Sequence, residues 1–206
     1  MRAYDATTLA AMSQMNAHSY SGSKRAEVRA LATSKAKRLW QSESGPLNQT
    51  LADDDDAAMF MAGRIITDLR ELKPEAWIDW QVSDPARSWA TLVVNGQRQM
   101  FTRLKRFYMH ANFSRYIRPG ATFVEVNNPN MVAAVSADGK QLTLVVRNPD
   151  TAAKAFTFDL TALGSVGEAV EIRRTSKTED LAMAAPAKIQ SWSFEATAAP
   201  FSITTF

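Results

Sequence analysis

The chain has 206 residues, of which 46% are hydrophobic, and this is enough to bury a core as one large domain or two small ones. Its 24 basic and 21 acidic residues leave a formal net charge of +3 and are spread along the whole sequence. No basic tract is present, so the composition gives no signal for a nucleic-acid partner. The absence of cysteine excludes disulfide bonds, thiolate catalysis and cysteine-ligated metal.

The apolar runs of the sequence are short. The longest ones, such as "AAMFMAG", fall far below the length that spans a bilayer, so we expect no membrane partner. The first residues, "MRAYDATTLAAMSQM", contain Asp5 and two threonines but no continuous apolar block, which is not the pattern of a signal peptide. As written, the sequence predicts a soluble chain without an export signal.

Helical and extended patterns alternate over the first half of the chain. Residues 5–15 predict a short helix with Asp5 as its N-cap, and further helices are expected over 24–38, 51–72 and 100–113. Between them, "NAHSY", "LWQSE" and "AWIDWQV" have the composition of short strands. Strand and helix take turns three times, which predicts a parallel sheet with crossover helices.

The most regular helical pattern lies in residues 51–72. Its apolar side chains recur at steps of three or four and form one stripe, made of Ala58, Met61, Ile65, Leu69 and Leu72. Four consecutive acids, Asp53 to Asp56, lie where the positive end of the helix dipole favours negative charge. We interpret them as a solvated, capped N-terminus rather than a metal site, because consecutive helical positions point in different directions.

From Thr122 onward the sequence changes to short alternating segments: "TFVEV", "QLTLVVRN", "AFTFDL", "EAVEIRRT", "SWSFEA" and "FSITTF". Apolar residues share one face within such segments, as Leu142, Leu144 and Val146 do, or Phe156, Phe158 and Leu160. This pattern predicts half-buried antiparallel strands packed as a β-sandwich. The change of pattern places a domain boundary between residues 118 and 119, with an α/β domain over 1–118 and an all-β domain over 119–206.

Side chains that can take part in catalysis occur where the predicted parallel strands end. Functional groups are expected there, because the backbone at a strand end is exposed and held rigidly. The three strand ends supply His18 and Tyr20, then Gln41, Ser42 and Glu43, and finally Trp80, Gln81 and Asp84. A carboxylate, an imidazole, a phenol and an indole at one mouth suit a sugar-cleaving cleft, in which aromatic faces stack on pyranose rings.

Each of these residues also has a structural interpretation. His18 could be a hydrogen-bonded structural histidine, and Glu43 could cap the turn before Gly45-Pro46. The tryptophans of this region could belong to the core, which is the commoner case for isolated ones. His110, on a helix among basic and aromatic residues, is best explained by surface packing.

Five segments occur in the order found in glycoside hydrolase family thirty: "NAHSYSGSKR", "LWQSESGP", "WIDWQVSD", "FSRYIRPG" and the closing "PFSITTF". The chain resembles the C-terminal part of these enzymes over essentially its whole length, and its "WQSESGP" form is most similar to the endo-β-1,6-galactanase branch. The resemblance implies the last three strand–helix units of a (β/α)8 TIM barrel, with "NAHSY", "LWQSE" and "WIDWQ" as barrel strands six to eight. An antiparallel β-sandwich side domain follows them.

The resemblance also implies a reaction and site roles. Glu43 falls on the family's catalytic nucleophile, and His18, Tyr20, Ser42 and Trp80 match positions that line its active-site cleft. The implied reaction is retaining hydrolysis of a β-linked polysaccharide, without cofactor or metal. In such a reaction a second carboxyl group protonates the leaving oxygen and then activates water.

One part of the family pattern is absent from this sequence. The family carries its acid/base glutamate in an Asn-Glu pair after the fourth barrel strand, and no Asn-Glu pair occurs here. We therefore expect a fragment that is inactive alone. Its partner would be the missing N-terminal half of the barrel, or it would self-associate through the exposed barrel edge. The full-length parent is expected to be secreted or periplasmic.

Two alternatives are open from the sequence. The chain could be a non-catalytic carbohydrate-binding or structural module, in which the aromatic residues hold sugar or the sandwich supports a partner. It could also come from a family relative that acts on glucuronoxylan or β-1,6-glucan.

Overall fold

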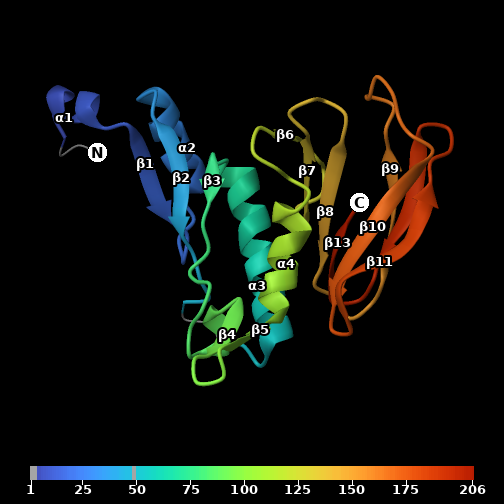
Figure 1. The fold of residues 1–206 in the computed structure, drawn as a ribbon. Helices are drawn as coiled ribbons and strands as arrows, with labels where there is room; N and C mark the ends of the chain where they lie inside the picture. The colour runs from blue at the N-terminus through green and yellow to red at the C-terminus, as the bar shows by residue number, and fades with distance from the viewer. Residues whose placement is uncertain (1–3, 48–49) are drawn as a thin grey trace.

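The structure is a computed structural model that describes residues 4–47 and 50–206 (Figure 1). The chain runs from a parallel sheet at one end of the molecule, through two long helices in the middle, to antiparallel sheets at the other end (Figure 1). The fold is therefore mixed α/β with a separate antiparallel part. Within the described ranges, no helix has the length and apolar character needed to cross a membrane.

Three parallel strands form the N-terminal sheet in the order β1-β2-β3. Helix α1 begins after Asp5, whose carboxylate accepts a 2.7 Å hydrogen bond from the backbone N–H of Thr8, as predicted. In chain order, the elements up to the third strand are α1 (Ala6–Ala11), β1 (Gln14–His18), α2 (Arg25–Ser34), β2 (Arg38–Glu43), α3 (Asp54–Thr67), a π-helical turn (Asp68–Leu72) and β3 (Ala76–Trp77). Strand β3 is shorter than the segment "AWIDWQV" predicted, because the backbone leaves the sheet after Trp77.

The apolar stripe of residues 51–72 is buried as predicted. Ala58, Met61 and Ile65 lie in the core cluster between α3, helix α4 (Lys105–Ser114) and the antiparallel sheet, and Leu72 packs under the parallel sheet. Asp53 caps α3, since its carboxylate accepts a 2.9 Å hydrogen bond from the N–H of Asp56. The acidic run thus serves as the helix N-terminus.

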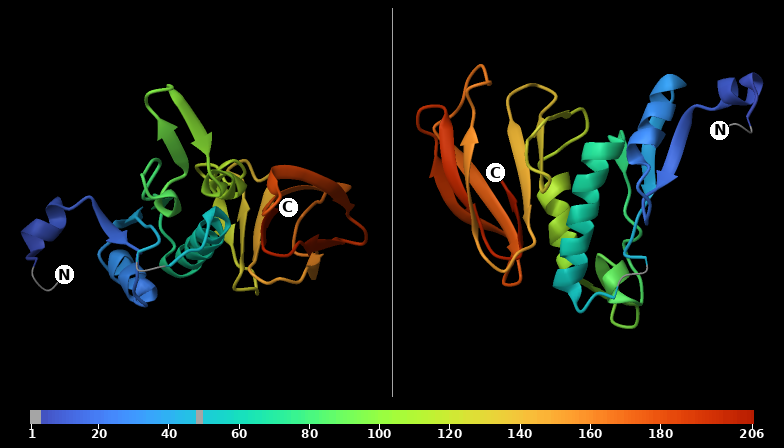
Figure 2. Two further views of the ribbon diagram at one scale, coloured as in Figure 1. Left: turned by 90° about the horizontal axis from the view of Figure 1, so that it is seen from below. Right: turned by 180° about the vertical axis from the view of Figure 1, so that it is seen from behind.

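The helix predicted over residues 100–113 is wrong in its first part. Residues 100–103 form strand β5 (Met100–Arg103), which pairs antiparallel with β4 (Leu92–Asn95), and helix α4 spans only Lys105–Ser114. The cross-strand pairs Val93 with Thr102 and Val94 with Phe101 bring together residue types that favour strands. Pairing with a strand that lies before residue 100 therefore overrides the local helical pattern. This hairpin projects away from the helices (Figure 2).

The antiparallel part contains eight strands in two sheets, ordered β11-β10-β13-β8-β7-β6 and β12-β9. They are β6 (Thr122–Val124), β7 (Met131–Val135), β8 (Leu142–Asn148), β9 (Lys154–Asp159), β10 (Ala169–Ser176), β11 (Glu179–Lys188), β12 (Ser193–Ala198) and β13 (Ser202–Thr205). The sequence did not predict β7 or β11. Strand β11 is alanine-rich and contains a proline, but it lies at the sheet edge, where a missing N–H is tolerated.

The six-stranded sheet is a middle layer with both faces covered. Val145 and Ile203 face the core shared with α3 and α4, whereas Leu144, Val146 and Phe206 face the β9–β12 pair. This confirms the predicted apolar faces of β8 and β9. The prediction of half-buried strands is wrong for β8 and β13, because α3 and α4 cover their other face. The predicted boundary between residues 118 and 119 lies in the turn between α4 and β6 and stays a prediction, and one buried cluster includes residues from both sides of it.

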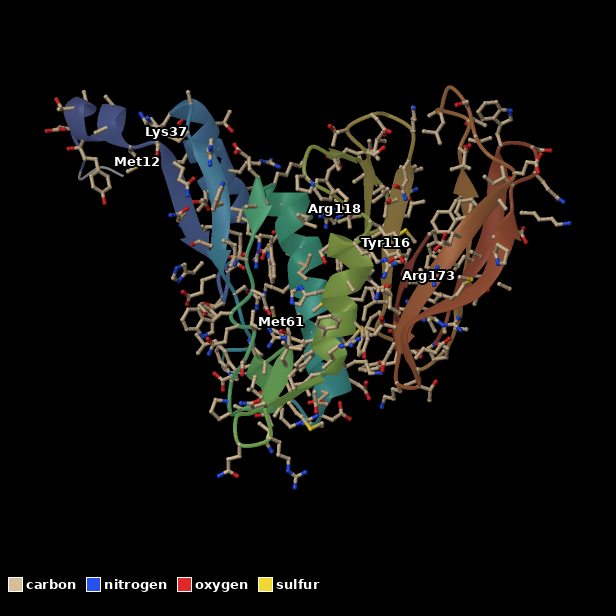
Figure 3. All side chains as sticks on the ribbon, viewed as in Figure 1. Met12, Lys37, Met61, Tyr116, Arg118 and Arg173 are labelled. Atoms are coloured by element: carbon tan, nitrogen blue, oxygen red, sulfur yellow. The ribbon has the colours of Figure 1, made fainter. Side chains whose placement is uncertain are left out.

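Polar contacts fix how the helices sit on this sheet. Asn112 of α4 is fully buried, donates to Thr175 Oγ1 at 2.6 Å and accepts from Thr205 Oγ1 at 3.0 Å. The interface is densely filled with side chains, and the labelled Tyr116 and Arg173 lie near one end of it (Figure 3). These bonds hold α4 and the hairpin that precedes it in a defined place relative to the sheet.

Candidate active site

Strands β1 and β2 end side by side. His18 is in register with Glu43, and the N–H of Ser19 donates to the carbonyl oxygen of Glu43 at 3.0 Å. In Figure 1 both strands point toward the end of the molecule where the β4–β5 hairpin lies. The carboxyl ends of the parallel strands and the hairpin therefore share one edge of the structure.

Glu43 is the centre of the contacts at this edge. Its Oε1 accepts a hydrogen bond of 2.5 Å from the Tyr20 hydroxyl and lies 3.8 Å from Nδ1 of His18. The His18 and Tyr20 rings meet edge to face, with centroids 6.0 Å apart. The Glu43 side chain is 27% exposed, so a molecule from solvent can reach a carboxylate that is already held in place.

Tyr20 is a hydrogen-bond donor at any physiological pH. Burial raises the pKa of its phenol well above the usual range, and the hydrogen bond to Glu43 and the negative charge of that residue raise it further. The phenol therefore keeps its proton and orients the carboxylate. This arrangement fixes one oxygen of the Glu43 carboxylate.

Two tryptophans contact the neighbours of Glu43. Trp80 is 43% exposed, and its backbone N–H donates to the carbonyl oxygen of Ser44 at 2.8 Å. Trp89 packs against Tyr20, with ring centroids 6.1 Å apart. A Cβ at Gly45 would lie 2.7 Å from the Trp89 ring and 2.9 Å from the Trp80 carbonyl oxygen. The glycine after "QSES" is needed for this close approach, so the turn packs against the Trp89 ring and the Trp80 backbone.

A buried carboxylate, Asp68, supports the strand ends from below. It has no exposed surface and accepts three hydrogen bonds, from Ser19 Oγ at 2.6 Å, Arg25 Nε at 2.6 Å and Trp77 Nε1 at 2.8 Å. These partners come from the end of β1, the start of α2 and β3. Sequence reasoning missed Asp68. Its position beside Leu69 in the apolar stripe was the available signal, since an acid in a buried stripe must be paired.

A second buried pair lies beneath the loop that carries the tryptophans. Arg106 of α4 is 1% exposed, and its guanidinium donates to Asp79 Oδ1 at 2.5 Å and to the Ser88 carbonyl oxygen at 2.6 Å. Burial lowers the pKa of Arg106, and the Asp79 charge opposes that effect. His110 Nε2 lies 3.1 Å from Asp79 Oδ2, and its ring lies 5.8 Å from that of Trp77. His110 is thus part of a half-buried cluster rather than the surface packing expected of it.

The structure brings together His18, Tyr20 and Glu43 by direct contact, and it links Trp80 to this group only through the backbone hydrogen bond to Ser44. Ser42 is half-buried on β2, next to Glu43. Gln41 is buried, and its side-chain oxygen accepts from the N–H of Ile78, which is a structural role. Asp84 accepts from Gln81 and from the N–H of Ala86 and so braces its own loop.

No family model matches the sequence. Over 167 residues, 80% of this chain and 33% of the relative, it is 29% identical to an endo-β-1,6-galactanase of Hypocrea rufa. The structure matches a GH30 endoxylanase of Clostridium papyrosolvens with a TM-score of 0.74 and 26% identity, covering 98% of this chain and 50% of that one. It also matches a glycoside hydrolase family 30 subfamily 8 xylanase of Clostridium acetobutylicum, with a TM-score of 0.80, 21% identity and the same coverages.

The chain therefore spans about a third of the curated relative and half of each solved structure. Sequence and structure together show a likeness to the C-terminal portion of glycoside hydrolase family 30 enzymes.

Proposed function

We propose that this chain is the C-terminal portion of a retaining glycoside hydrolase and that Glu43 is its catalytic nucleophile. On this proposal β1, β2 and β3 are the last three strands of a (β/α)8 barrel, whose active sites lie at the carboxyl ends of the strands. The observation that carries the proposal is the position of Glu43. It is a partly exposed carboxylate at such a strand end, held by a phenol that keeps its proton.

The proposed reaction has two steps. An oxygen of Glu43 attacks the anomeric carbon, the glycosidic carbon–oxygen bond breaks, and the leaving oxygen takes a proton from a second carboxyl group. That group, now a carboxylate, then removes a proton from water, and the resulting oxygen displaces Glu43 from the sugar. Retaining enzymes place the two carboxyl groups about 5 to 5.5 Å apart, and we propose that the N-terminal portion of the barrel supplies the second one.

The other side chains of the site have matching roles in this proposal. Tyr20 fixes one carboxylate oxygen, which leaves the other oriented for attack. Trp80 offers an exposed indole face on which a pyranose ring can stack. His18 is 56% exposed and can offer a ring nitrogen to the sugar, and Ser42, next to the nucleophile on β2, is assigned a substrate contact in this proposal.

We propose β-1,6-galactan as the substrate, supported by the "WQSESGP" segment and by the likeness to the Hypocrea rufa enzyme. The endoxylanase neighbour supports a xylan as the second substrate to test, and we propose glucuronoxylan. Such polysaccharides do not cross a cell membrane, so we infer that the whole protein acts outside the cytoplasm.

The proposal is tested by assaying the chain alone and joined to its barrel's N-terminal portion. We expect the isolated chain to release no reducing sugar from β-1,6-galactan, glucuronoxylan or β-1,6-glucan, because it lacks the acid/base group. We expect the joined protein to hydrolyse one of them, with the new chain end retaining its anomeric configuration in a proton NMR time course. Hydrolysis by the isolated chain, or inversion by the joined protein, would contradict the proposal. Binding without hydrolysis by the joined protein would instead favour a carbohydrate-binding module.

A further inference from the structure

We propose that Arg106 is a positioning residue for the nucleophile. From helix α4 it holds both ends of the loop over residues 79–88 and thereby keeps Trp89 against the Tyr20–Glu43 pair. This inference rests on the proposed function only in that Glu43 is taken as the reacting group. The contacts that carry it lie outside the site itself.

Arg106 lies between two points of the same loop and bonds to both. One arm of the guanidinium, Nη2, donates to the Asp79 carboxylate at 2.5 Å, where the chain has just left β3. The other arm, Nη1, donates to the Ser88 carbonyl oxygen at 2.6 Å, at the far end of the loop. The side chain is 1% exposed, so water does not compete for either bond.

A chain of contacts connects this loop to the Glu43 carboxylate. Ser88 directly precedes Trp89, whose ring packs on Tyr20 with centroids 6.1 Å apart. Trp89 also fills the space above Gly45, where a Cβ would lie 2.7 Å from its ring. Tyr20 in turn donates the 2.5 Å hydrogen bond to Glu43. A displacement of Ser88 would therefore move the indole that keeps Tyr20 away from solvent.

The two hydrogen bonds of this position suit an arginine side chain. A planar guanidinium donates in two fixed directions at once, which a lysine ammonium on a flexible stem does not do. A buried charge is costly, and replacement by apolar residues often leaves stability unchanged or improves it. Its presence here beneath the two site tryptophans is explained by geometry that must be fixed rather than by stability.

The test uses the isolated chain and needs no substrate. Arg106→Gln and Arg106→Lys are compared with wild type by absorbance titration of tyrosine at 295 nm, and subtraction of Tyr20→Phe isolates the signal of Tyr20. We expect Arg106→Gln to lower the Tyr20 midpoint by about one pH unit or more, read over the pH range in which circular dichroism shows the chain folded, because the phenol gains solvent. Loss of a nearby positive charge alone would raise this midpoint, so the sign separates the two causes.

Arg115→Gln is the matched control, because Arg115 is an exposed cation at the end of the same helix. Its Tyr20 midpoint should equal that of wild type. If Arg106→Gln does not fold, as judged by circular dichroism, Arg106→Lys decides the question. It keeps the charge beside Asp79 but loses the second bond, and the midpoint should again fall. A folded Arg106 variant with a wild-type Tyr20 midpoint would overturn the proposal.

Kinetics of the joined enzyme supply the second readout. We expect Arg106→Lys to lower kcat about 100-fold while KM changes less than about threefold, since misplacement of a reacting group acts on the transition state. An unchanged kcat overturns the role. The titration is independent of substrate, so it can fail while Glu43→Gln still abolishes hydrolysis, and it can succeed whichever glycan is cleaved.

Discussion

Replacement of Glu43 by glutamine in the joined enzyme should lower kcat by at least about 10⁴-fold, since loss of a covalent nucleophile removes the intermediate itself. The fold should be kept, because the glutamine side-chain oxygen can still accept the Tyr20 hydrogen bond. The measurement is the initial rate of reducing-sugar release, with the thermal unfolding midpoint determined in parallel.

Glu27→Gln is the matched control for this substitution. Glu27 lies on α2 with its side chain 70% exposed, so the same chemical change there should leave both kcat and the unfolding midpoint unaltered. If Glu43→Gln keeps more than about a tenth of the wild-type rate, Glu43 is not the nucleophile.

Replacement of Asp68 by alanine should lower the free energy of unfolding by about 3–5 kcal/mol, because it leaves the Arg25 guanidinium largely buried without its counter-charge. It also removes the acceptor of Ser19 and Trp77. Urea denaturation followed by circular dichroism gives this value, provided the transition is two-state.

Glu71→Ala is the control for Asp68, since Glu71 is exposed on the same helical segment. It should change the free energy of unfolding by less than about 0.5 kcal/mol. A loss at Asp68 no larger than this would show that the strand ends do not depend on the buried carboxylate.

The elements that the sequence predicted well are those in which local pattern and tertiary burial agree. The stripe of α3 faces the core, and the Asp53 cap lies where an acidic helix start predicted it. The alternation of Leu142, Leu144 and Val146 identified the face of β8 that packs against the β9–β12 pair. Each of these signals is contained in one segment and needs no knowledge of its partners.

The errors come from contacts between segments distant in sequence. Residues 100–103 come shortly before a helical segment in the sequence, but pairing with β4 makes them a strand. Strand β11 has a composition that predicts no strand, and it is stabilised by its long pairing with β10. Backbone pairing of this kind is not encoded in local periodicity.

The candidate site was predictable to the extent that its residues follow parallel strands. His18, Tyr20 and Glu43 fall at two strand ends, and the register of β1 with β2 brings them together. Asp68 and Arg106 were missed, because their roles depend on three-dimensional neighbours from other elements. Asp79 was predicted inside a strand, whereas it lies in the loop after β3 and pairs with Arg106.

The central claim is that Glu43 forms a covalent bond to the sugar, and trapping that bond tests it most directly. The joined enzyme is incubated with a 2-deoxy-2-fluoro-β-galactosyl fluoride, in which fluoride leaves without needing a proton and the 2-fluorine slows release of the sugar. Peptide mass spectrometry should find the fluorosugar esterified to Glu43, and Glu43→Gln should remove the label. A label on any other carboxylate, or hydrolysis of the reagent by an active enzyme with inversion at the anomeric carbon, would contradict the account.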